Sequence, residues 1–285
     1  MGANSTIEWT HHTFNPWWGC VRVSPACKNC YAEAWASRFA LDVWGPKADR
    51  RRFSDAHWKE PLRWNREAAQ AGERRRVFCA SMADVFEARA DLSPERERLW
   101  ALIQATPQLD WLLLTKRPER IGATVPWQNK WPHNVWIGTS AENQKWADKR
   151  IPVLLTYPAV VRFISCEPLL GRLDVAKWLG DQSSRQKINW VIAGGESGRR
   201  ARPMLPIWVT SLRDQCSLSR TPFFFKQWGN WAPVNEGVAE SAGRTVTVSE
   251  FSFRRSPKHV AGRLLNGQTW NEIPSQLSHH RKVAE

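Results

Sequence analysis

The stretch Trp111-Leu112-Leu113-Leu114-Thr115, followed at once by Lys116-Arg117, has the pattern that decides the fold. Its residues are apolar without alternation, as expected for a strand buried on both faces of a parallel sheet, and polar side chains begin where it ends. Similar runs occur at Val77–Ala80, Val135–Gly138, Val160–Ser165, Trp190–Ala193 and Pro222–Phe225. With a first strand near Thr13, they predict about seven strand–helix units.

Helix signals lie between these runs. Ser93-Pro94-Glu95 combines a capping residue, a first-turn proline and an early acid, and Pro206–Ser217 has apolar residues at helical spacing. Right-handed crossovers favour an α/β fold with a complete or partial (β/α) barrel, and an open doubly wound sheet is the alternative. We expect the barrel over 1–229 and a C-terminal extension over 230–285, with a β-hairpin around Thr245–Phe253.

Composition limits the class of protein. The chain has 285 residues, and its 41 Lys and Arg against 27 Asp and Glu give a formal charge of +14. Its 42% of hydrophobic residues excludes wholesale disorder. No apolar run is long enough to cross a bilayer and the start lacks a signal sequence, so we expect a cytoplasmic protein without a membrane partner. The charge fits nucleic acid as partner, and equally a generally basic surface; the 19 Trp fit base stacking as well as a core.

Three of the six cysteines, Cys20, Cys27 and Cys30, lie close together in the sequence. A disulfide framework is not expected in a long chain with so few cysteines, and such a trio indicates a metal or cluster site. Three thiolates hold three irons of a 4Fe-4S cluster and leave the fourth iron open. The alternative is structural zinc, which needs a fourth ligand that His11 or His12 would supply.

The cysteine loop also carries a family resemblance. Asn15-Pro16, Gly19-Cys20 and Cys30-Tyr31-Ala32 resemble the cluster loop of radical S-adenosyl-L-methionine (radical SAM) enzymes, closest to the branch that contains spore photoproduct lyase. A longer pattern is similar to a phage-associated three-cysteine radical-SAM-like family: it comprises Thr6–Thr10, Cys-x6-Cys-x2-Cys, Ser165–Leu169, Gly194–Gly198 and Ala261–Leu265.

This resemblance implies a partial barrel with a 4Fe-4S cluster on Cys20, Cys27 and Cys30 and S-adenosylmethionine (SAM) on the open iron. It also implies reductive cleavage of SAM to a 5′-deoxyadenosyl radical, with an external electron donor. Three features depart from the superfamily pattern. Six residues instead of three separate the first two cysteines, Asn29 replaces an aromatic residue, and Gly194-Gly195-Glu196 follows the sixth predicted strand instead of the second.

Ligands of such folds bind at the carboxyl ends of the strands, so residues just after the strands are candidate SAM contacts. Asp84 and Glu142 would suit its amine or ribose, although Glu142 also fits a solvated helix start. Lys116 or Arg117 would receive its carboxylate or a substrate phosphate. Gly194 and Gly195 would allow close approach, or simply form a turn. The expected cofactor-binding set is Tyr31, Ser81, Asp84, Lys116, Ser140, Glu142, Gly194, Gly195 and Glu196.

Cys166 follows a strand, where its thiol would donate a hydrogen atom to a product radical as a catalytic residue; the alternative is a small buried side chain. Trp17 and Trp18 would stack bases or seal the cluster from water. The expected nucleic-acid contacts are Arg117, Arg199, Arg200, Arg202 and Lys226. We therefore expect a radical SAM enzyme acting on nucleic acid, with lyase-type repair of DNA photoproducts favoured. Base modification, a peptide or small-molecule substrate, and a nucleic-acid-binding module with a structural metal are the alternatives.

Overall fold

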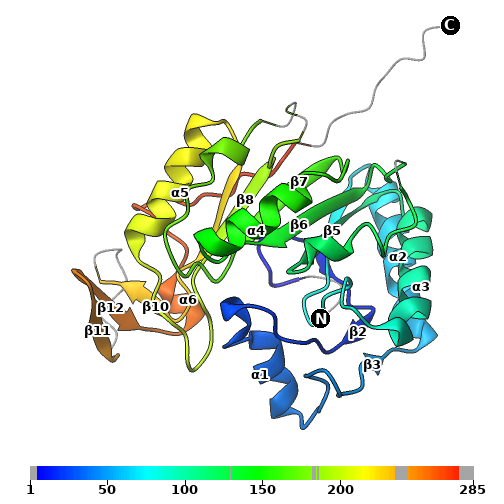
Figure 1. Ribbon diagram of the computed structural model, residues 1–285, viewed down its shortest axis with the longest axis horizontal. Helices are drawn as coiled ribbons and strands as arrows, with labels where there is room; N and C mark the ends of the chain where they lie inside the picture. The colour runs from blue at the N-terminus through cyan, green and yellow to red at the C-terminus, as the bar shows by residue number, and fades with distance from the viewer. Residues whose placement is uncertain (1–4, 129, 182–183, 185, 235–242, 276–285) are drawn as a thin grey trace, which may run out of the picture.

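A computed structural model describes residues 5–128, 130–181, 184, 186–234 and 243–275. Its centre is a seven-stranded parallel sheet in which the strands lie side by side in chain order (Figure 1). The strands are β1 (His12–Thr13), β4 (Arg75–Cys79), β5 (Leu109–Thr115), β6 (Val135–Ser140), β7 (Val161–Cys166), β8 (Trp190–Gly194) and β9 (Phe223–Gln227). No pairing joins β1 to β9 in the described part of the chain, so the sheet is a half-barrel. The predicted partial (β/α) barrel is confirmed.

The strand order also excludes the open doubly wound alternative. A doubly wound sheet reverses its strand order at a switch point and carries helices on both faces. Here the order runs in one direction from β1 to β9. Residues of the helices α2 (Asp55–Gln70), α3 (Ser93–Ala105), α4 (Gln144–Leu154) and α5 (Pro206–Leu218) pack in one core with one face of the sheet. α3 begins at Ser93 with Pro94 in its first turn, but its N-cap is Leu92, so the predicted capping role of Ser93 is wrong.

Two cores explain why the strand sequences are apolar without alternation. Alternate residues of the strands β4 to β9, such as Cys79, Leu113 and Cys166, belong to the core between sheet and helices. The intervening residues form a second core on the concave face, where the Trp9 ring contacts Phe78 of β4 and Trp190 of β8. The second core consists of Trp9, Phe78, Leu112, Trp136, Val161, Phe163, Trp190, Ile192 and Phe224. A strand must be apolar on both faces to fill two cores, as its sequence predicted.

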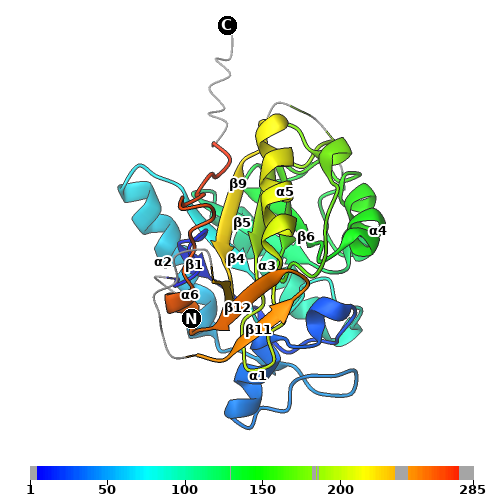
Figure 2. The same ribbon diagram turned by 90° about the vertical axis from the view of Figure 1, so that its left-hand side faces the viewer.

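The remaining elements extend the half-barrel at its ends. β2 (Trp17–Trp18) pairs with β3 (Arg51–Arg52), and α1 (Tyr31–Arg38) follows the cysteine loop. Short 3-10 turns lie at Pro25–Cys27, Ala90–Leu92, Pro118–Arg120 and Ala176–Trp178. A small sheet is formed by β10 (Trp231–Pro233), β12 (Phe251–Arg255) and β11 (Thr245–Val248), followed by α6 (Lys258–Ala261). In both views, α1 and the small sheet lie at the same end of the large sheet (Figure 2).

The antiparallel pair β11–β12 confirms the predicted hairpin. The chain then returns to the half-barrel, where Asn271 bridges to Phe224 and the Glu272 carboxylate accepts the Phe223 N–H at 2.8 Å. The boundary at residue 229 stays a prediction. Among the described residues, we find no helix with the length and apolarity that a membrane span requires.

Candidate functional site at the carboxyl ends of the strands

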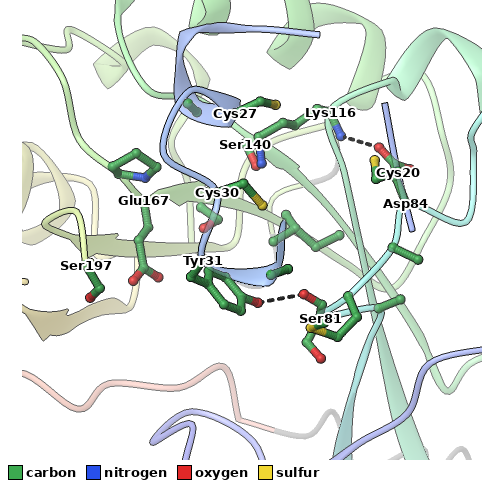
Figure 3. Close-up of a pocket in the computed structure, with 18 of the residues that line it drawn as sticks. Cys20, Cys27, Cys30, Tyr31, Ser81, Asp84, Lys116, Ser140, Glu167 and Ser197 are labelled. Carbon is green, nitrogen blue, oxygen red and sulfur yellow. Dashed lines mark hydrogen bonds between the residues drawn. The ribbon is translucent and has the colours of Figure 1, made fainter. Parts of the chain in front are cut away.

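One cavity of about 740 Å³ lies where the strands end, a volume typical of small-molecule sites. All three cysteines of the loop line it (Figure 3). The structure also brings most of the other predicted residues to its wall: Tyr31, Ser81, Asp84, Lys116, Arg117, Ser140, Gly195, Glu196 and Lys226. Parallel strands end at the same edge of a sheet, and this common edge is why residues far apart in sequence meet here.

The cysteine loop starts at a position that only glycine can occupy. Gly19 has φ +116°, a backbone region that favours glycine, and a Cβ there would lie 2.1 Å from the Val43 carbonyl oxygen. Its N–H donates to the Met82 carbonyl at 3.0 Å, which ties the start of the loop to the segment after β4. Cys30 ends the loop at the N-cap position of α1.

Two buried carboxylates hold the middle of this loop. Glu142 accepts the Ala26 N–H at 3.3 Å and pairs with Arg150 at 2.9 Å. Glu196 accepts from the Asn29 amide at 2.9 Å and pairs with the Arg202 guanidinium. Both carboxylates are at least 95% buried. They are thus engaged in fixing the loop, and the expectation that Glu142 and Glu196 contact a cofactor directly is not supported by their contacts.

Arg202 belongs to the same arrangement. Its guanidinium donates to Glu196 and, at 3.1 Å, to the Pro25 carbonyl of the cysteine loop. The predicted role of Arg202 in contacting nucleic acid therefore needs correction, because its donors already bind within the protein. Asn29, which replaces an aromatic residue, reaches Glu196 and the Arg200 carbonyl, and so serves the same fixation.

Asp84 and Arg117 form a second buried pair, at 2.8 Å. The two Asp84 oxygens accept from Thr115 Oγ1, from Arg117 and from the backbone N–H groups of Phe86 and Lys116. Arg117 Nη1 lies 3.8 Å from Cys20 Sγ, and its Nη2 donates to the Val21 carbonyl at 2.8 Å. Arg117 is 7% exposed and is engaged within the protein beside the first cysteine, so its contact with nucleic acid stays a prediction without support from its surroundings.

Burial disfavours the thiolate form of two of the loop cysteines, Cys20 and Cys30. It raises the pKa of Cys20 to about 12, an effect that Asp84 strengthens and Arg117 opposes. Burial also raises the pKa of Cys30. Thiolates are the ligands of iron and zinc, so a metal must displace these protons when it binds.

The donor set discriminates between zinc and a cluster. No three His, Cys, Asp or Glu side chains in the described ranges are arranged to hold one metal ion. His12 stacks on Trp64 with ring centroids 4.4 Å apart, and His11 Nδ1 accepts the Arg76 N–H. Neither histidine lines the cavity. The histidines expected to complete a zinc site are therefore outside the cavity lining, whereas a cluster that uses a different iron for each thiolate needs only the three cysteines that line it.

Polar groups next to the cysteines remain available for a ligand. Ser140 Oγ is buried and has no hydrogen-bond partner among the described residues, although Ser140 lines the cavity. The Tyr31 hydroxyl donates to the Ser81 carbonyl at 2.7 Å, while the ring lines the cavity (Figure 3). Asn15 supports this wall because its Oδ1 accepts the Met82 N–H at 2.7 Å.

The two glycines after β8 differ in their surroundings. A Cβ at Gly195 would lie 1.9 Å from the Trp228 carbonyl oxygen, so glycine is required there by backbone packing. Gly194 does not line the cavity and lies behind Glu167, whose Cδ is 3.3 Å from the position of a Cβ. Gly194 is therefore screened from the cavity by Glu167, and its close approach to a cofactor stays a prediction.

The Cys166 side chain does not lie where the sequence predicted it. The side chain is fully buried in the core between sheet and helices and does not line the cavity. Burial raises the pKa of its thiol. Because successive residues of a strand face opposite sides, Ser165 and Glu167 line the cavity and Cys166 faces away from it. The structure thus removes the predicted hydrogen-atom donor from the site.

Three polar residues of the cavity, Glu167, Ser197 and Gln227, are outside the expected cofactor-binding set although each follows a strand. Glu167 accepts from Lys226 Nζ at 2.9 Å and from Gln227 Nε2 at 3.1 Å, and Gln227 Nε2 also donates to Ser197 Oγ. Lys226 is therefore paired inside the cavity instead of facing a phosphate backbone. Glu167, Gln227 and Ser197 each stand just after a strand, and this position was the available signal. Arg199 and Arg200 are exposed, and their contact with nucleic acid stays a prediction.

The fold and the cavity define an α/β half-barrel protein with a cysteine-lined site at the carboxyl ends of its strands. The chain belongs to the family described as "Protein of unknown function (DUF5131)", whose model matches residues 4–274. No curated protein matches the chain.

Solved structures of spore photoproduct lyase are similar to it. One is a double mutant with bound AdoMet and dinucleoside spore photoproduct, which is 11% identical to this chain. The match covers 89% of this chain and 73% of the lyase chain, with a TM-score of 0.46. Two single mutants of the lyase have 10% identity and TM-scores of 0.48 and 0.47. Each match covers 90% of this chain, and the two matches cover 71% and 73% of the lyase chains. The phage association stays a prediction.

Proposed function

We propose that this protein is a radical SAM enzyme that acts on nucleic acid, with lyase-type repair of a DNA photoproduct as the favoured reaction. The observation that carries the proposal is that Cys20, Cys27 and Cys30 all line one cavity of about 740 Å³ at the carboxyl ends of a parallel half-barrel. Three cysteines with no fourth cysteine or histidine among the described lining residues suit a cluster with one open iron.

The three cysteines would hold a 4Fe-4S cluster, and Tyr31, Ser81, Lys116 and Ser140 would contact SAM bound beside it. When bound, this pair supplies one-electron cleavage chemistry that produces a radical able to abstract hydrogen. An external donor would provide the electron. The protein contributes position: Arg117 contacts Cys20, while Glu142 and Glu196 bind Ala26 and Asn29, the residues on either side of Cys27 and Lys28.

Nucleic acid is the proposed substrate class because of the +14 charge and the exposed Arg199 and Arg200. Both arginines lie in the loop that follows Glu196, whose carboxylate holds the cysteine loop. A phosphate backbone at this edge would bring a base to the cavity, and enzymes that act on bases take them out of the stack in this way. Base modification, or a peptide or small-molecule substrate, would show itself as SAM cleavage without turnover of photoproduct DNA.

Anaerobic reconstitution with iron and sulfide tests the cluster. We expect about four irons per chain, a brown protein, and 5′-deoxyadenosine after addition of dithionite and SAM. Cys27→Ala should lose the cluster and the cleavage. Cys216→Ala is the matched control, because its thiol is fully buried in the helix-side core and does not line the cavity. Stoichiometric zinc in place of iron, or a cluster of unchanged iron content in Cys27→Ala, would reject the proposal.

A further inference from the structure

A row of four aromatic side chains runs along the surface beside the cavity. Phe53, Trp18, Trp35 and Phe39 contact one another in this order, with ring centroids 5.2, 5.0 and 4.5 Å apart. We refer to these four residues as the aromatic row. They are partly or largely exposed, and Phe39 is 60% exposed. By contrast, Trp17 is fully buried, so only Trp18 of the Trp-Trp pair remains at the surface.

The row is continuous with the candidate site. Trp35 lies on α1 and lines the cavity, as does Arg38 at the end of the same helix. The other end of the row rests on the β2–β3 pair, which places Trp18 opposite Arg51. Figure 1 shows α1, β2 and β3 on the same side of the molecule, beyond the end of the large sheet.

Arginines lie beside the row, and the carboxylate of Asp55, two residues after Phe53, is paired with Arg98. Arg51 lies over the Trp18 ring at 4.5 Å and over the Phe53 ring at 5.6 Å. Arg51 and Arg38 are exposed. Glu33, which lies on α1 beside the row, pairs with Arg22 at 2.7 Å, so its charge is compensated locally. The surface therefore offers flat apolar faces together with guanidinium groups.

We infer that the aromatic row is the binding surface for a single-stranded segment of the nucleic-acid substrate, and leads its bases toward the cavity. This inference rests on the proposed function. Bases stack on aromatic faces while arginines meet the phosphates, and this combination is typical of single-strand binding. In a duplex the base faces are already stacked on neighbouring bases, so they cannot stack on the aromatic row. An acidic peptide would need the arginines but not the ring faces.

The test measures binding of a fluorescein-labelled oligothymidylate of about twelve nucleotides to the full chain by fluorescence anisotropy at low salt. Phe39→Ala and Phe39→Leu should each weaken binding by about five-fold or more, because stacking of one base on an aromatic ring accounts for that much affinity. Leu218→Ala is the matched control: it removes another apolar side chain, 88% exposed, at the far end of α5. It should bind as the wild type does, as should Phe39→Trp.

Salt titration tests the arginine contribution. Arg38→Gln should reduce the slope of log K against log salt by about 0.7, the value for one phosphate contact on a single strand. Arg66→Gln, an exposed arginine on α2, should leave the slope unchanged. A duplex of the same length should bind more weakly than the single strand and be insensitive to Phe39→Ala.

Wild-type affinity unchanged in both Phe39→Ala and Phe39→Leu would overturn this inference alone. Equal competition by a polyglutamate peptide would likewise overturn it in favour of an acidic peptide. If the wild type binds no oligonucleotide at low salt, the substrate class of the proposed function fails together with the inference. The iron content and 5′-deoxyadenosine assays then decide separately whether the radical chemistry stands.

Discussion

His12 provides a quantitative test of the packing behind β1. Its imidazole is 4% exposed and stacks on Trp64 of α2, and neither ring nitrogen has a hydrogen-bond partner among the described residues. Burial, with smaller contributions from Arg75 and His11, lowers the pKa of His12 from 6.5 to about 4. Arg63 lowers the pKa further and Glu67 opposes the shift. The folded protein therefore keeps this ring neutral where the unfolded chain protonates it.

The sign of the effect follows from proton linkage. Between pH 6.5 and 4 the unfolded chain binds more protons at His12 than the folded protein does, so the free energy of unfolding falls as the pH falls through this window. The depressed pKa corresponds to a loss of about 2 kcal/mol between about pH 7.5 and pH 5, and of about 3 kcal/mol at pH 4. Below the folded pKa the loss is complete.

His12→Phe keeps a ring that stacks on Trp64 but cannot be protonated. Urea unfolding of the apoprotein, under reducing conditions at about pH 7.5 and pH 5, measures the free energy of unfolding of both proteins. Carboxylates titrate equally in the wild type and in the variant. The difference between the two proteins in the pH dependence of the unfolding free energy therefore reports on His12. We expect the variant to gain about 2 kcal/mol on the wild type on going to pH 5. A difference that is the same at both pH values would refute a neutral, buried His12.

Two further substitutions test the assignment of contacts in the site. Arg202→Met removes a donor to Glu196 and to the Pro25 carbonyl, so Cys27 of the apoprotein should react with a thiol reagent several-fold faster; an unchanged rate would show that Arg202 does not fix the loop. Cys166→Ala should retain wild-type iron content and turnover and cost about 1 kcal/mol of unfolding free energy, because the thiol packs in the helix-side core. Loss of turnover with intact SAM cleavage would restore the hydrogen-donor role.

Much of the fold could be predicted because two-sided burial leaves a local trace. Strands such as Trp111–Thr115 fill a core on each face, so their residues are apolar without interruption. The end of each run also marks the edge where ligands bind, which is why Ser81, Lys116 and Ser140 were found. Three closely spaced cysteines need no tertiary information to be recognised as one ligand group.

The partners of charged side chains could not be predicted in the same way. Arg117, Arg202 and Lys226 were expected to meet nucleic acid, yet each pairs with a carboxylate inside the protein. These pairs join different strands and loops. A buried charge has to find a partner, and its choice depends on which side chains the completed fold places within reach.

The chain alone therefore determined the strand–helix repeat and the cysteine trio, since both depend on neighbours in sequence. The tertiary structure decided which way each side chain faces. It also decided which residues of the cavity bind one another and which remain available to a ligand. Cys166 shows the reason: it adjoins Ser165 and Glu167, which line the cavity, yet it packs against the helices. A step of one residue along a strand turns a side chain to the opposite face, and the register that sets this step is established only when the whole sheet is assembled.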